Sequence, residues 1–143
     1  MTKSNVVLGK RPKSFKRIVE FPMLDGSKGA IECVFKYRTR KEFGAYIDER
    51  TKAAKDLVES ANAAAAEAAF DKAEDAKPFS VAEFYEQEVS KGADYLAGVL
   101  EGWNLDHEFG RDALEQLCDE IPAAASAIVD AYRAAVLEGR LGN

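Results

Sequence analysis

The chain has 143 residues, of which 47% are hydrophobic and 31% are charged, and its formal net charge at pH 7 is −5. This length and composition are typical of a single soluble globular domain with its own core. They exclude a bilayer-spanning helix, because no apolar run approaches the necessary length. The basic N-terminus also lacks the apolar stretch of a signal peptide, so we expect a cytoplasmic protein.

Charge is distributed unevenly along the chain. Residues 1–41 hold 11 Lys and Arg against 3 Asp and Glu, whereas residues 42–143 hold 9 against 22. This pattern fits either a basic nucleic-acid-binding segment or contact between basic and acidic parts, within one molecule or between copies. The basic residues are not interleaved with stacking aromatic residues and no helix-turn-helix pattern accompanies them, so protein contact is the favoured interpretation.

A β-hairpin is predicted over residues 14–38, after a flexible tail over residues 1–13. In its second half Ile31, Cys33, Phe35 and Tyr37 alternate with other residues at the period of a half-buried strand. The segment Leu24-Asp25-Gly26-Ser27 supplies an Asp-Gly turn. Because a hairpin alone is marginally stable in water, we expect it to pack on the rest of the chain.

Helices are predicted from about residue 40. Thr39 and Glu42 have the spacing of a capping box, in which each side chain satisfies a free N–H of the first turn. Residues 53–76 are alanine-rich, which favours a helix but leaves little bulk to bury. We interpret this segment as a linker between two lobes, and a partner-binding surface is the alternative.

The helical part continues over residues 80–139. Pro78 breaks the preceding helix, and Ser80 with Glu83 forms a second capping box. An apolar stripe then predicts a helix that ends at Gly102, with the members Val81, Phe84, Tyr85, Val89, Gly92, Leu96, Val99 and Leu100. A short helix follows, marked by Leu114, Leu117, Cys118 and Ile121.

Pro122 suits the first turn of a last helix. The residues expected on its inner face are Ala125, Ile128, Val129, Tyr132 and Val136. The predicted fold class is α+β: an N-terminal β-hairpin packed on a mostly α-helical part of about four helices, in one domain over residues 14–143.

The segment EGWNLDHEF, residues 101–109, contains the only tryptophan and the only histidine of the chain. Its acidic residues and His107 are immediate neighbours, whose side chains diverge in a helix or a strand, and no second histidine completes an HExxH motif. We therefore interpret the segment as a structural joint. Trp103, Leu105 and Phe109 would turn inward, with the ring of Trp103 in the core and its indole N–H bonded to a carbonyl or a water. Asn104 or Asp106 would cap the next helix.

No catalytic arrangement emerges from the remaining residues. Cys33 and Cys118 lie among apolar neighbours and are expected to be reduced and buried, which would raise the pKa of Cys118. The chain contains no GxSxG elbow, no phosphate-binding loop and no GxGxxG motif. The sequence predicts a non-enzymatic protein without a cofactor or a metal.

Four segments resemble, in their order and spacing, the tail assembly chaperones of long-tailed bacteriophages and prophages: FKRIVEFPMLDGSKGAIECVFKYRTRKEFGAYIDE, FYEQEV, LEGWNLDHEF and IPAAASAIVDAYRAAVLEGRLGN. The resemblance implies a non-enzymatic protein of the host bacterial cytoplasm, absent from the mature virion. Such a protein binds the tape measure protein, keeps it soluble and promotes assembly of the tail tube around it. The resemblance also implies the tail tube protein as a partner, through a frameshifted product with a C-terminal extension.

A chaperone of a helical client needs an apolar groove. The candidate partner-binding residues are Phe84, Tyr85, Trp103, Leu105 and Phe109. The opposite charges of the two parts of the chain favour head-to-tail association into a homo-oligomer, whereas no membrane and no nucleic acid are expected as partners. The alternative function is a small phage or prophage regulator that binds nucleic acid through Lys10, Arg11, Lys13, Lys16 and Arg17.

Overall fold

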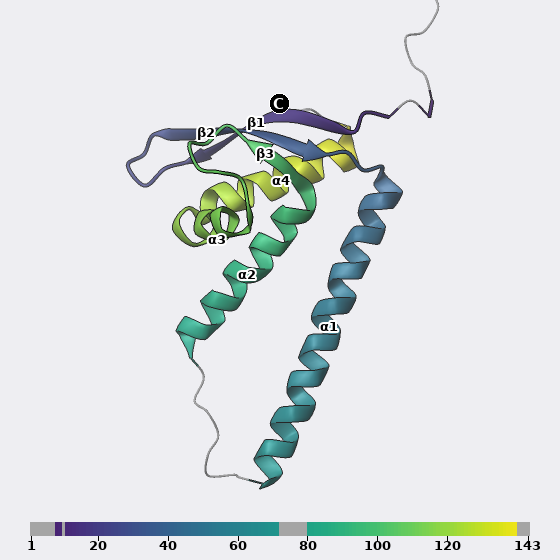
Figure 1. The fold of residues 1–143 in the computed structure, drawn as a ribbon, viewed down its shortest axis with the longest axis vertical. Helices are drawn as coiled ribbons and strands as arrows, with labels where there is room; N and C mark the ends of the chain where they lie inside the picture. The colour runs from purple at the N-terminus through teal and green to yellow at the C-terminus, as the bar shows by residue number, and fades with distance from the viewer. Residues whose placement is uncertain (1–7, 10, 72–79, 140–143) are drawn as a thin grey trace, which may run out of the picture. The chain divides into compact units, whose positions relative to one another are not determined.

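A computed structural model describes residues 8–9, 11–71 and 80–139 (Figure 1). Within these residues the elements follow the order β1 (Ser14–Pro22), β2 (Lys28–Lys36), α1 (Arg40–Asp71), α2 (Val81–Val99), β3 (Leu100–Trp103), α3 (Arg111–Glu120) and α4 (Pro122–Glu138). The predicted α+β class, a hairpin followed by four helices, is confirmed for this part of the chain. Most of the predicted flexible tail, and residues 72–76 of the alanine-rich segment, lie outside the described residues.

The chain divides into two compact units. One consists of Met1–Tyr37 with Glu88–Asn143, and the other of Arg38–Gln87. Helix α2 runs through the boundary at Glu88, and the single domain expected over residues 14–143 stays a prediction. The alanine-rich segment is helical up to Asp71, the last residue of α1.

The hairpin forms as predicted. Strands β1 and β2 are antiparallel, and the register places Phe15 opposite Phe35 and Val19 opposite Ile31. In the turn, Gly26 adopts a φ of 88°, the left-handed conformation that glycine accepts without strain. The Asp25 carboxylate accepts hydrogen bonds from the Ser27 hydroxyl at 2.5 Å and from the Ser27 N–H at 2.9 Å, and both lower the pKa of Asp25. The Asp-Gly turn therefore fixes the register of the two strands.

The helix predicted to reach Gly102 ends earlier, because the next residues form a third strand. Leu100–Trp103 pairs with β2 in the order β1-β2-β3, and the register shifts between Val34 and Phe35. This pairing satisfies backbone groups at the edge of β2 and places Leu100, which is 1% exposed, opposite Phe35. A strand of four residues that contains a glycine gives no periodic signal, so the sequence did not predict it.

The predicted capping role of Asn104 or Asp106 is wrong. The Asn104 N–H donates to the Glu32 carbonyl at 3.2 Å, and the Asn104 Oδ1 accepts from the Glu32 N–H at 2.9 Å. Asn104 thus continues the β2–β3 ladder with its own side chain. Helix α3 begins after Gly110, which makes no side-chain cap.

The core lies between the inner face of the sheet and the helices of the first unit. At its centre the Tyr132 ring of α4 lies 5.3 Å from the Phe35 ring and 6.1 Å from the Phe15 ring, measured between centroids. The Tyr132 hydroxyl donates to the Lys36 carbonyl at 2.9 Å, so its polar atom is satisfied although the residue is fully buried.

The buried face of α4 differs slightly from the predicted one. Ile128 and Tyr132 are fully buried as expected, but the third buried residue is Ala124 and not Ala125. These three residues form one row at a spacing of four, along which the helix contacts the sheet. The other predicted members, Ala125, Val129 and Val136, are only half-buried.

The predicted stripe of α2 is buried only in its second half. Ala93, Leu96 and Val99 are buried, whereas Val81, Phe84 and Tyr85 are exposed. The Lys36 ammonium group donates to the Ala97 carbonyl at 3.3 Å, in the last turn of this helix. A cation at that position stabilises the negative end of the helix dipole.

Local signals set the helix ends. The Thr39 N–H donates to the Glu42 carboxylate at 2.9 Å and the Glu42 N–H donates to the Thr39 hydroxyl at 3.2 Å, so the first capping box is complete. At the start of α2, the Glu83 N–H donates to Ser80 Oγ at 3.3 Å. Pro122 occupies the first turn of α4, as predicted.

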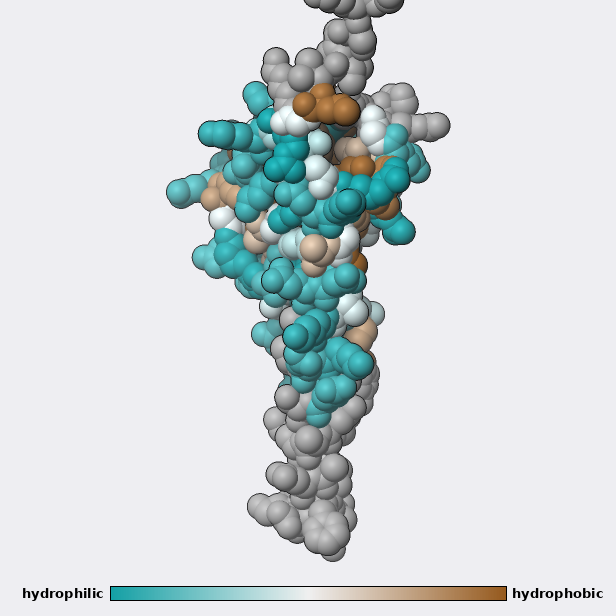
Figure 2. Space-filling view, turned by 90° about the vertical axis from the view of Figure 1, so that its right-hand side faces the viewer, coloured by the Kyte–Doolittle hydropathy of each residue, from teal (hydrophilic) through white to brown (hydrophobic). Residues whose placement is uncertain are grey.

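Hydrophilic side chains cover most of the described surface on the face shown in Figure 2, and hydrophobic side chains form small separate patches there. None of the helices in the described ranges has both the length and the apolar character that a bilayer crossing requires.

Candidate protein-binding site

An apolar hollow of about 210 Å³ opens between the segment that begins at Trp103 and helix α3. Its lining residues are Trp103, Leu105, His107, Ala113, Gln116, Leu117, Glu120 and Ile121. Leu117 is buried, whereas Trp103, Leu105 and Ile121 are half-buried, so apolar surface reaches the solvent. Pockets for whole small-molecule ligands usually exceed about 300 Å³. The hollow therefore suits one or two apolar side chains of a protein partner.

Trp103 forms a fixed wall of this hollow. Its indole N–H donates to the His107 carbonyl at 2.9 Å, which confirms the predicted bond to a carbonyl. The Phe109 ring packs edge-to-face against it, with centroids 5.2 Å apart and an interplanar angle of 84°. The expectation that the ring lies in the core is wrong, because Trp103 ends the edge strand β3 and remains half-exposed. The result is a rigid aromatic surface that is available for contact.

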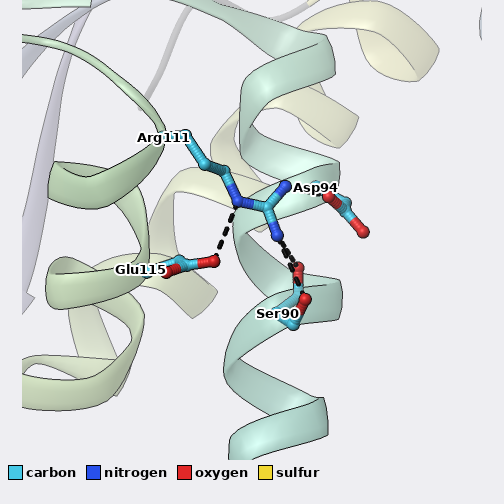
Figure 3. A network of polar contacts seen from close by, with 4 residues as sticks. All are labelled: Ser90, Asp94, Arg111 and Glu115. Atoms are coloured by element: carbon cyan, nitrogen blue, oxygen red, sulfur yellow. Dashed lines mark hydrogen bonds and ion pairs between the residues drawn. The ribbon is translucent and has the colours of Figure 1, made fainter.

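Helix α3, the opposite wall, is attached to α2 by Arg111 (Figure 3). The guanidinium group donates to Glu115 at 3.1 Å and to both the carbonyl and the hydroxyl of Ser90 at 3.1 Å, and it forms an ion pair with Asp94. A single partly exposed ion pair contributes little stability. One planar guanidinium shared among four acceptors, however, defines the position of α3 against α2.

The same two helices approach closely at Gly92. A Cβ atom on Gly92 would lie 3.1 Å from the Cys118 sulfur, so glycine leaves the space that this thiol occupies. Burial raises the pKa of Cys118, and the nearby Arg111 partly opposes this shift. Burial also raises the pKa of Cys33 to about 12. Both thiols are free, as expected, but only Cys33 is buried, whereas Cys118 is half-buried. Their raised pKa values make both poor nucleophiles at neutral pH.

The acidic neighbours of His107 do not gather into a reaction centre. Asp106, His107 and Glu108 are all exposed. Among the described residues, no group of three His, Cys, Asp or Glu side chains is placed to hold a metal ion.

The five predicted partner-binding residues belong to two local clusters. Trp103 and Leu105 line the hollow and Phe109 supports the tryptophan ring. Phe84 and Tyr85 lie in the first turns of α2, within the other unit, with centroids 5.6 Å apart, and they are 44% and 62% exposed. Three further lining residues, Ala113, Gln116 and Glu120, were not predicted from the sequence. Their spacing with Leu117, which follows one face of a helix, is a signal that would have found them.

A model of the phage tail assembly chaperone family matches residues 1–143. The chain therefore belongs to the phage tail assembly chaperone family, as the resemblance implied. This is a non-catalytic assembly family, whose members have protein partners in tail assembly. Neither the search of curated proteins nor the search of solved structures found a match.

Proposed function

We propose that this chaperone binds the tape measure protein, keeps it soluble and promotes assembly of the tail tube around it. It acts in the host bacterial cytoplasm and is absent from the mature virion. Membership of the family supports the role in tail assembly. The single observation that carries the binding step is the half-exposed apolar hollow beside Trp103.

The hollow suits a helical client. An amphipathic helix inserts apolar side chains into a groove at spacings of three and four residues. A space of about 210 Å³ with walls of Trp103, Leu105 and Leu117 accepts such an anchor. Gln116 and Glu120, on the same face of α3, offer polar contacts to the backbone or polar side chains around the anchor.

The small size of the site matches a chaperone that must later release its client. One anchor gives weak binding per copy, and many copies along one long client bind it strongly through multivalency. Tube subunits can then displace the copies one at a time. A frameshifted product with a C-terminal extension would add the tail tube protein as a second partner.

The aromatic cluster of α2 is a second candidate contact. Val81, Phe84 and Tyr85 are 56%, 44% and 62% exposed, a concentration of large apolar surface within two helical turns. Exposed apolar clusters of this kind mark interaction sites, and aromatic residues dominate the binding energy of interfaces.

Co-expression with the tape measure protein of the same phage tests the proposal. We expect the client to be soluble only with the chaperone, and the pair to co-elute in size-exclusion chromatography with light scattering at several chaperone copies per client. Leu105→Ser and Tyr85→Ser should lower the soluble fraction of the client. Asp106→Ser and Glu86→Ser alter exposed neighbours of these residues and serve as matched controls.

A client that is soluble alone and does not co-elute contradicts the proposal. Salt-dependent binding of duplex DNA by the wild type, lost when Lys13, Lys16 and Arg17 are replaced, would then support the nucleic-acid-binding alternative. Circular dichroism of each variant separates loss of binding from loss of fold.

A further inference from the structure

Strand β1 forms an edge of the sheet. In the order β1-β2-β3, only one side of β1 pairs with another strand among the described residues. The hydrogen bonds at the two ends of this pairing show which residues face β2. The Tyr37 N–H donates to the Lys13 carbonyl at 3.1 Å, and the Met23 N–H donates to the Ser27 carbonyl at 2.8 Å. The odd-numbered residues of β1 therefore direct their backbone groups towards β2.

The even-numbered residues consequently direct theirs towards the open edge. These are Lys16, Ile18 and Glu20 in the middle of the strand. At this edge the Lys16 carbonyl accepts a hydrogen bond at 2.6 Å from the Arg17 guanidinium group. This is a side-chain contact and not a pairing with another strand. Such an edge, nine residues long, is a template for pairing with another chain.

The side chains of the same three residues carry a symmetric pattern. All three are exposed, on the sheet face opposite to Tyr132, and Ile18 is 66% exposed. A cation lies two residues before this isoleucine and an anion lies two residues after it. Two such strands are therefore complementary when they run antiparallel, because the lysine of each then lies opposite the glutamate of the other.

We propose that two copies of this protein pair through β1, antiparallel, with Ile18 opposite Ile18 of the partner subunit. In this register Lys16 lies opposite Glu20 of the partner subunit, and Glu20 lies opposite Lys16 of the partner subunit. The even residues of the two strands exchange backbone hydrogen bonds, and the interface is isologous. Pro22 falls at the end of the paired segment, where its missing N–H removes few bonds.

Charge and apolar contacts select this register. A shift by two residues would place Ile18 opposite a charged residue in both subunits, and it would remove both pairs between Lys16 of one subunit and Glu20 of the other. Parallel pairing would bring Lys16 beside Lys16 of the partner subunit. Directly opposed like charges are destabilising, whereas opposite charges and apolar pairs stabilise a sheet. Lysine on an edge strand normally prevents pairing, so its match with Glu20 makes the contact specific.

Charge-reversal variants test this register, with the mass of the full chain measured by sedimentation equilibrium. The measurements extend to high protein concentration, because a single strand pair is a small interface that dimerises weakly. In a homodimer of either variant, Lys16→Glu or Glu20→Lys, residues 16 and 20 carry the same charge. Like charges then lie opposite each other at both of the symmetry-related pairs. Each variant should weaken the dimer roughly tenfold or more. An equimolar mixture of the two variants restores both attractive pairs and should restore the dimer. Lys52→Glu, an equal charge change on the exposed surface of α1, should leave the wild-type mass unchanged.

Amide hydrogen exchange gives an independent readout. The N–H groups of Lys16, Ile18 and Glu20 should become protected as the protein concentration rises, whereas those of Arg17 and Val19 should be protected at every concentration by their bonds to β2. A wild type that is monomeric throughout, or a dimer that survives both single variants, would overturn the proposal. So would exchange at the three even residues that does not depend on concentration.

Discussion

The indole N–H of Trp103 donates a hydrogen bond to the backbone carbonyl of His107, four residues further along the chain. This bond closes the loop that follows β3 and holds the aromatic wall of the hollow in place. It uses the backbone of His107 and not its imidazole. His107, the only histidine of the chain, thus holds the tryptophan ring through its backbone carbonyl, a group that every residue possesses.

Replacing Trp103 should therefore be costly and replacing His107 should not. Trp103→Ala removes a half-buried ring and should lower the free energy of unfolding by about 2–3 kcal/mol. Trp103→Phe keeps an aromatic ring beside Phe109 but loses the hydrogen bond, at a cost of about 1 kcal/mol. His107→Ala should be neutral within about 0.5 kcal/mol. Urea unfolding should be followed by circular dichroism, because the Trp103 variants lack the only fluorescent tryptophan. A large effect of His107→Ala would contradict this account.

Gly29 should tolerate no side chain. A Cβ atom at this position would lie 2.6 Å from the Phe21 ring, which covers the glycine from the neighbouring strand. Gly29→Ala should therefore destabilise the protein by about 1–3 kcal/mol, since the buried ring must move. Gly102→Ala is the matched control, because a Cβ atom there meets nothing within 4 Å. Thermal unfolding of the two variants compares them directly, and equal melting temperatures would refute the steric argument.

The buried hydroxyl of Tyr132 should contribute measurably to stability. Tyr132→Phe keeps the contacts with Phe15 and Phe35 but leaves the Lys36 carbonyl without this donor. We expect a loss of about 1–2 kcal/mol in the free energy of unfolding. Tyr85→Phe, at an exposed position, should change it by less than about 0.5 kcal/mol. If both substitutions have the same small effect in chemical denaturation, the hydroxyl does not stabilise the core.

Cys33 should make the free energy of unfolding depend on pH in the alkaline range. Burial raises its pKa from the ordinary value of 9.0 to about 12, so the folded state holds the thiol proton more tightly than the unfolded state. The resulting stabilisation is complete below pH 9 and is lost as the pH rises from 9 to about 12. Cys33→Ala lacks this group, and its unfolding free energy should fall less steeply from about pH 9 to about pH 12 than that of the wild type. Identical slopes would show that Cys33 ionises as easily when folded.

The sequence determined the features that depend on near neighbours. The alternation of residues 31–37 and the Asp25-Gly26 turn predicted the hairpin, because strand register follows from the pleat and from the turn. Thr39 with Glu42 predicted the start of α1, and Pro122 predicted the start of α4, because capping groups act within one helical turn. The predicted bond of the Trp103 indole also joins residues only four apart.

The contacts between residues far apart in the chain depend on the tertiary structure. Strand β3 exists because Leu100–Trp103 meets the open edge of β2, and Asn104 bonds to Glu32 and not to a helix end for the same reason. The Lys36 side chain bonds to Ala97, which is 61 residues away in the chain. The Lys36 carbonyl bonds to Tyr132, which is 96 residues away. Local patterns carry no information about such pairs, because they form only when the sheet and the helices have packed together.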